Sequence, residues 1–226
     1  MLAVVARVFA DTVLVAIVLF AFAGTLVWPR AWTLIAVLFL IRVATAITVF
    51  RVNPTLLRER ARLPLHPAQP RADKLILFSF MVSAFVGVPA IAAFDIFHWH
   101  VSRHVPLPLA IFGLALFTAG WVVIALALRA NAFAVTVVRA QPERMHVVVD
   151  TGPYCVVRHP MYAGNPMVTL GLSLWLGSYV AALCAIFPLA LLMLRIVLEE
   201  RLLRRQLPGY SDYVKRVRYR LVPGLW

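Results

Sequence analysis

The chain of 226 residues is 63% hydrophobic and only 14% charged, and its formal net charge is +13. Charged residues make up about a quarter of an average soluble domain, so this composition excludes an ordinary soluble protein. The basic excess would suit nucleic-acid binding in a soluble chain. Here the arginines gather between long apolar segments, which favours membrane topology as the explanation and argues against nucleic acid as a partner.

Four apolar segments are each long enough to cross a hydrocarbon core of about 30 Å. They occupy residues 8–28, 31–50, 75–94 and 105–128. The first segment is too long for the apolar core of a signal peptide, so we expect a retained span. A fifth region, 166–198, is interrupted at Gly177-Ser178, which predicts two helices packed as a hairpin. The expected fold is all-α: a polytopic integral membrane protein with four full spans plus a C-terminal helical hairpin, five to six membrane helices in total.

Basic residues are distributed unevenly between alternate loops. They are frequent in 51–74, in 129–165 and in the C-terminal tail, whereas the opposite loops carry only Arg30 and Arg103. The positive-inside rule then places both termini and the two basic loops in the cytoplasm. The basic, aromatic tail is expected to contact anionic lipid headgroups. The abundance of Arg, Ala and Val suggests a GC-rich bacterial genome and therefore a bacterial cytoplasmic membrane.

Asn53-Pro54 predicts the start of a short helix within the first basic loop, because proline is tolerated in the first helical turn. Leu56 and Leu57 would anchor this helix at the membrane interface. We expect one membrane domain over residues 1–226. The N-terminal spans fill 1–128, and a cytoplasmic loop, the hairpin and the tail fill 129–226.

Candidate metal ligands are few and poorly spaced. The outer loop 95–104 contains three histidines, but their spacing in a flexible loop is a weak metal signature, and Trp99 indicates an interface anchor. The two cysteines, Cys155 and Cys184, have no metal-site or disulfide spacing. We therefore expect no metal.

The segment GPYCVVRHPMYAG, residues 152–164, is unusually specific for a loop between membrane helices. His159-Pro160 predicts a helix start, which directs free backbone N–H groups towards a ligand beside His159. Tyr154 and Tyr162 offer flat faces for a purine ring or a cation. The alternative is that Arg158 marks the cytoplasmic boundary and the tyrosines form an aromatic belt.

Arg195 and Glu199 are four residues apart on a helix that leaves the bilayer, so they share one face. They form either a plain ion pair, which stabilises by about 0.3–0.5 kcal/mol, or the wall of a site. In a site, the arginine would hold an anionic substrate group and the carboxylate would meet a cation or accept a proton. Arg42 lies inside the second span, where pairing or a polar cavity is favoured.

The pattern G-P-Y-x-x-x-R-H-P-x-Y-x-G, followed by a hairpin, R-x-x-x-E-E and G-Y-x-x-Y, resembles the isoprenylcysteine carboxyl methyltransferase (ICMT) family. Small prokaryotic membrane members are the most similar, and the likeness is strongest from Asn131 to Trp226. The resemblance implies an S-adenosylmethionine-dependent membrane methyltransferase with S-adenosylhomocysteine as product. The acceptor would be lipophilic: a carboxylate, as in prenylcysteine methyl esterification, or a lipid amine.

The resemblance also implies the site residues within a cytoplasmic cofactor loop. The cofactor would contact Gln141, His146, Val147, Val148, Val149, Tyr154, His159, Pro160, Met161 and Tyr162. Arg195 and Glu199 would be catalytic: Arg195 would orient a carboxylate acceptor, and Glu199 would accept the proton of an amine acceptor.

Two other classes of function remain open from the sequence. Membrane sterol and steroid reductases share R-H-P-x-Y-x-G near the C-terminus and bind NADPH. Here Glu199-Glu200 follows instead of their usual motif, and acidic residues suit a sulfonium better than an additional phosphate. The third class is a non-catalytic membrane scaffold, in which Arg42 and the pair Arg195 and Glu199 would be structural.

Overall fold

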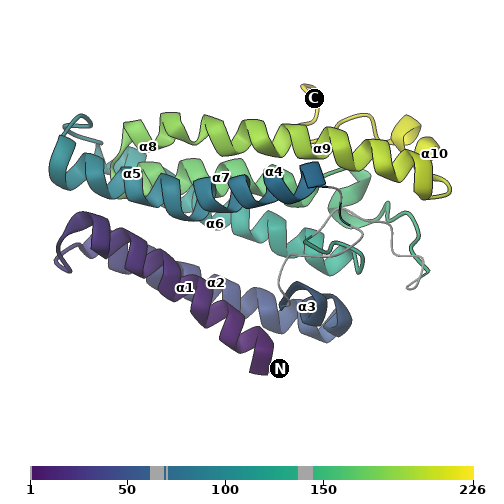
Figure 1. Cartoon of the computed structure of the whole chain (residues 1–226), viewed down its shortest axis with the longest axis horizontal. Helices are drawn as coiled ribbons and strands as arrows, with labels where there is room; N and C mark the ends of the chain where they lie inside the picture. Colours follow the sequence, from purple (N-terminus) through teal and green to yellow (C-terminus); the bar gives the residue numbers. More distant parts are fainter. Residues whose placement is uncertain (1, 62–68, 70, 137–144) are drawn as a thin grey trace.

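The apolar segments form helices that lie roughly side by side (Figure 1). The computed structural model describes the chain except for residues 1, 62–68, 70 and 137–144. Every regular element in these described residues is helical. The α-helices are α1 (Leu2–Ala23), α2 (Pro29–Val52), α3 (Pro54–Ala61), α4 (Arg71–Val82), α5 (Val88–Phe94), α6 (Leu107–Ala130), α7 (Pro160–Leu176), α8 (Tyr179–Cys184), α9 (Ile186–Gln206) and α10 (Tyr210–Arg216).

Five helical segments are long and apolar enough to cross a membrane. They are Val4–Ala23, Pro29–Val52, Arg71–Trp99, Leu107–Ala130 and Tyr179–Gln206. The 17-residue helix α7 lies beside α6 and, with α8 and α9, forms the predicted C-terminal hairpin. The prediction of an all-α polytopic membrane protein is confirmed.

The third span is longer than the sequence predicted. The π-helical turn Ser83–Gly87 joins α4 to α5, and a second π-helical turn, Asp95–Trp99, extends α5, so that one continuous helix ends at Trp99. The segment 95–99 is therefore helix and not loop. The carboxylate of Asp95 accepts hydrogen bonds from the backbone N–H groups of Val101 and Ser102, both at 3.0 Å, and thereby closes the turn after the helix.

Proline and glycine set the helix boundaries near the C-terminus. His159 precedes Pro160 at the first position of α7, as predicted. Gly177 ends α7 with a left-handed φ of 98°, which glycine adopts without steric penalty. Helix α9 stops at Gln206, before Pro208, and Gly209 adopts a φ of 79°. These local signals separate α7, α9 and α10.

Helices α6 and α7 pack closely through four glycines. Gly113 and Gly120 on α6 face Gly164 and Gly171 on α7. A Cβ atom at Gly120 would lie 2.7 Å from the carbonyl oxygen of Gly164, which is closer than van der Waals contact allows. Glycine thus permits the backbone contact that places the start of α7 beside the end of α6, as in membrane helix pairs generally.

Gly120→Ala should therefore destabilise the protein by about 1–3 kcal/mol, because the two backbones must separate. Thermal unfolding in a non-ionic detergent would measure the change. Gly87→Ala is the matched control, since a Cβ there would meet only the Val82 carbonyl oxygen at 3.7 Å. Equal stability of the two variants would contradict the role of the glycine contact.

Helix α3 lies at one end of α1 and α2, the same end of the bundle as α10 (Figure 1). It begins at Pro54 as predicted, but Leu56 and Leu57 are buried in the core, so their expected role as interface anchors is wrong. The side-chain amide of Asn53 donates to the Leu128 and Arg129 carbonyl oxygens at 3.2 and 2.8 Å. These bonds fix α3 against the end of α6.

Candidate active site

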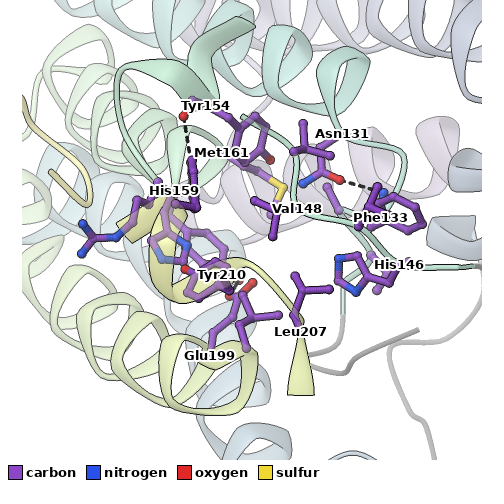
Figure 2. A pocket seen from close by; sticks show the side chains of 18 residues that line it. Asn131, Phe133, His146, Val148, Tyr154, His159, Met161, Glu199, Leu207 and Tyr210 are labelled. Carbon is purple, nitrogen blue, oxygen red and sulfur yellow. Dashed lines mark hydrogen bonds between the residues drawn. The ribbon is translucent and has the colours of Figure 1, made fainter. Parts of the chain in front are cut away.

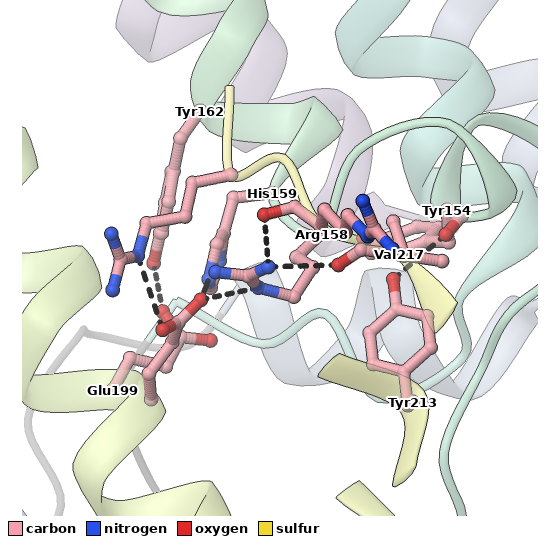
Figure 3. A network of polar contacts seen from close by, with 10 residues as sticks. Tyr154, Arg158, His159, Tyr162, Glu199, Tyr213 and Val217 are labelled. Atoms are coloured by element: carbon pink, nitrogen blue, oxygen red, sulfur yellow. Dashed lines mark hydrogen bonds and ion pairs between the residues drawn. The ribbon is translucent and has the colours of Figure 1, made fainter. Parts of the chain in front are cut away.

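The segment Arg158-His159-Pro160, which we call the RHP motif, holds the C-terminal tail in place (Figure 3). The backbone N–H groups of Arg158 and His159 donate to the carbonyl oxygens of Tyr219 and Arg220, both at 2.9 Å. The Arg158 guanidinium donates to the Val217 carbonyl oxygen at 2.7 Å. Arg158 is buried, so its guanidinium serves these contacts within the protein and not lipid headgroups.

Glu200 supplies the counter-charge for this arrangement, a role that the sequence did not reveal. Its carboxylate lies 2.6 Å from Arg158 Nε, 3.3 Å from His159 Nε2 and 3.1 Å from Arg220 Nε. Glu200 is 3% exposed. One buried carboxylate therefore joins α9, the start of α7 and the tail.

A cavity of about 80 Å³ lies beside this network (Figure 2). Eight of the predicted cofactor residues line it: His146, Val147, Val148, Val149, Tyr154, His159, Met161 and Tyr162. Pro160 is buried in the first turn of α7 and does not line the cavity, and Gln141 lies outside the described residues. Glu199 also lines the cavity. We call this space the first cavity.

The sequence missed several residues of the first cavity, because they come from segments that the RHP motif does not include. They are Asn131, Phe133, Ala134, Val135, Leu203, Leu207, Tyr210 and Tyr213. The G-Y-x-x-Y pattern of the tail is the signal that could have identified the two tyrosines.

Tyrosine hydroxyls provide much of the polar surface near the first cavity. Tyr213 donates to the Tyr154 carbonyl oxygen at 2.7 Å, and Tyr162 donates to Glu199 Oε2 at 2.7 Å. The hydroxyl of buried Tyr210 has no hydrogen-bond partner among the described residues. Burial raises the pKa of Tyr154 to about 12 and also raises the pKa of Tyr210, so both hydroxyls stay protonated at neutral pH.

A second cavity, of about 200 Å³, lies between the N-terminal helices and α6, α7 and α9. Met161 and Tyr162 line both this second cavity and the first. Apolar side chains from α1 and α4 cover much of the second cavity, among them Val4, Val8, Leu77 and Phe80. The two cavities therefore adjoin at the first turn of α7.

Arg195 and Glu199 do not form the plain ion pair that their spacing allowed. Arg195 lines the second cavity, where its Nε lies 2.9 Å from Asp73 Oδ1 and its Nη2 donates to the Thr136 carbonyl oxygen. Glu199 lines the first cavity and accepts the Tyr162 hydroxyl. Tyr162 lies between them, with Arg195 Cζ 5.8 Å from its ring centroid.

Arg42 both pairs with a carboxylate and lines a cavity, the two arrangements that its position inside the second span favoured. Its guanidinium lies 2.6 Å from the Asp11 carboxylate, and it lines the second cavity. Its Cζ also lies 5.3 Å from the ring centroid of Trp121. The pair joins α2 to α1 inside the membrane region.

Comparison with known proteins supports the predicted class. Residues 109–208, from α6 to the end of α9, match the family model described as phospholipid methyltransferase. The solved structure of the eukaryotic intramembrane Ras methyltransferase ICMT (isoprenylcysteine carboxyl methyltransferase) is similar, with a TM-score of 0.56 and 19% sequence identity. The match covers 94% of this chain and 73% of that chain. A search of curated proteins found no match.

The chain is therefore an integral membrane methyltransferase. More particularly, it has the ICMT fold, and the region that matches the phospholipid methyltransferase model supplies α7 and α9 to both cavities. The resemblance found in the sequence is confirmed, and the comparisons favour neither the reductase nor the scaffold.

Proposed function

We propose that the protein transfers a methyl group from S-adenosylmethionine, bound in the first cavity, to a lipophilic acceptor that enters the second cavity from the membrane. The supporting observation is that Met161 and Tyr162 line both cavities. A donor and an acceptor on either side of these two residues would be held close together. Such positioning can lower the activation free energy of a displacement reaction by several kcal/mol.

The side chains of the first cavity fit S-adenosylmethionine. Phe133, His146 and Tyr154 offer flat faces for a purine ring. The Glu199 carboxylate suits a sulfonium cation, and the unpaired hydroxyl of Tyr210 can donate to the ligand. The Arg158 guanidinium is held by Glu200 and by backbone carbonyl oxygens, so it is not free to bind the additional phosphate of NADPH.

Bound S-adenosylmethionine would supply an electrophilic methyl group and leave as S-adenosylhomocysteine. A carboxylate acceptor would form the new C–O bond without a proton transfer. An amine acceptor must first lose a proton, and Glu199 is the nearest predicted base, already hydrogen-bonded to Tyr162. The chain's own contribution is to align the acceptor at Met161 and Tyr162 and to exclude water.

The site end of the bundle would face the cytoplasm of a bacterial cell, with both termini on that side. The uneven distribution of basic residues supports this orientation. Arg201, Arg204, Arg205 and Lys215 are exposed on α9 and α10 at this end, where anionic lipid headgroups would contact them.

Binding of S-adenosylhomocysteine, compared with binding of NADPH, tests the proposal directly. Isothermal titration of the full chain in non-ionic detergent should show binding of S-adenosylhomocysteine alone. Tyr210→Phe removes only the unpaired hydroxyl and should weaken binding about 3–10-fold.

Tyr179→Phe is the matched control for this substitution, because Tyr179 is exposed at the start of α8 and lines neither cavity. Its affinity for S-adenosylhomocysteine should equal that of the native chain. Binding of NADPH in place of S-adenosylhomocysteine would overturn the proposed function.

A further inference from the structure

The charged groups of the second cavity are unequal in number. Among the residues that the structure describes, one carboxylate, that of Asp11, lines it together with four guanidinium groups, those of Arg7, Arg42, Arg60 and Arg195. Asp11 is shared, since it lies 2.9 Å from Arg7 and 2.6 Å from Arg42. Arg195 is neutralised by Asp73. The described lining of the cavity therefore has an excess of positive charge in an apolar setting, where an unpaired charge is unfavourable.

Of the four arginines that line the second cavity, Arg60 is the one without a carboxylate partner among the described residues. It lies near the end of α3, and its Nη1 donates to the Ala134 carbonyl oxygen at 2.7 Å. The same nitrogen lies 3.6 Å from Met161 Sδ, at the wall between the two cavities. Burial lowers the pKa of Arg60 to about 10, which still leaves it protonated at neutral pH.

Trp121 supplies an independent observation in the same cavity. The residue is 9% exposed, and its indole N–H finds no acceptor among the described residues. An indole nitrogen can only donate a hydrogen bond, and a buried donor is normally satisfied. Among the described residues, the indole N–H of Trp121 thus lacks a hydrogen-bond acceptor and Arg60 lacks a carboxylate partner. A single anionic group could supply both.

We propose that the acidic group of the acceptor lipid binds to Arg60 and to the indole N–H of Trp121. Arg60, and not Arg195, is then the cation that selects the acceptor. The inference rests on the proposed function and defines its substrate class: a lipid with a carboxylate or phosphate group. Arg60 belongs to α3, outside the region that matches the phospholipid methyltransferase model.

The position of Arg60 explains how an acid-bearing lipid would be oriented. The apolar side chains of Val4, Val8 and Phe80 surround the cavity and suit an acyl or prenyl chain. The acidic group would lie beside Met161, where the second cavity adjoins the first. Binding at Arg60 would therefore place the polar end of the lipid, and not its tail, next to the methyl donor.

Three lipids of similar chain length test the inference by equilibrium binding to the full chain in non-ionic detergent: palmitate, methyl palmitate and 1-palmitoyl lysophosphatidate. The native chain should bind at least one of the two acids about tenfold more tightly than the uncharged ester. Preference for palmitate would identify a carboxylate, and preference for lysophosphatidate would identify a phosphate. Equal binding of all three lipids would overturn the inference.

Arg60→Gln should abolish this preference, and Trp121→Phe, which removes the indole donor, should reduce it about threefold. Arg60→Lys keeps the charge and should retain most of the preference. Arg58→Gln is the matched control, because Arg58 is exposed on the same helix and does not line the cavity. Unchanged acid preference in Arg60→Gln would overturn the inference.

Binding of S-adenosylhomocysteine separates this inference from the proposed function. Each variant should retain that binding, which also shows that it is folded; if Arg60→Gln does not fold, Arg60→Lys and Trp121→Phe decide the outcome. A native chain that prefers the acids but does not bind S-adenosylhomocysteine would refute the proposed function alone. A native chain that binds S-adenosylhomocysteine without acid preference would refute the inference alone.

Discussion

Glu200→Gln is expected to lower the free energy of unfolding by about 3–5 kcal/mol, because it leaves the buried Arg158 without its counter-charge. Glu200 is 3% exposed, so water cannot replace the lost carboxylate. The tail carrying Tyr210 and Tyr213 should loosen, and affinity for S-adenosylhomocysteine should fall with it. Thermal and denaturant unfolding in non-ionic detergent would measure the first effect, and titration the second.

Glu199→Gln provides the control, since it makes the same chemical change one residue earlier. Glu199 is only partly buried and accepts the Tyr162 hydroxyl, which a glutamine oxygen can also do. Its stability should change by less than about 1 kcal/mol. Similar losses in the two variants would show that the charge of Glu200 has no special role.

Arg195→Gln is the second substitution with a large expected effect, a loss of about 3–5 kcal/mol of stability. Asp73 is 1% exposed, so the loss of the guanidinium 2.9 Å from its carboxylate would leave a buried charge without its arginine partner. Denaturant unfolding would measure the loss. Arg204→Gln, on the exposed face of the same helix, should leave stability nearly unchanged.

The double variant Asp73→Asn with Arg195→Gln distinguishes an ion pair from two independent contributions. Removing both charges should restore part of the lost stability, so the two single effects should not add. Simple additivity would mean that Arg195 is stabilised chiefly by its bond to the Thr136 carbonyl oxygen and by Tyr162. The cycle thus tests whether Arg195 is already neutralised, as selection of the acceptor by Arg60 requires.

The sequence by itself determined the presence and order of the membrane spans and the hairpin, although α1 runs over Leu2–Ala23 and not over the predicted segment 8–28. Apolar length is a local property, and proline and glycine act on the backbone where they stand. Pro160 and Gly177 were therefore sufficient to place the two ends of α7. The third span extended beyond its predicted end because Asp95, although charged, is buried and caps the following turn.

The partners of the charged residues were decided only by the tertiary structure. Helical spacing placed Arg195 and Glu199 on one face, but Arg195 pairs with Asp73, 122 positions away, and Tyr162 separates it from Glu199. The neighbouring Glu200 points instead to Arg158, because successive residues on a helix are about 100° apart. A sequence shows which charges share a helix face, whereas the packing of distant helices decides which of them are neutralised and which, like Arg60, remain for a ligand.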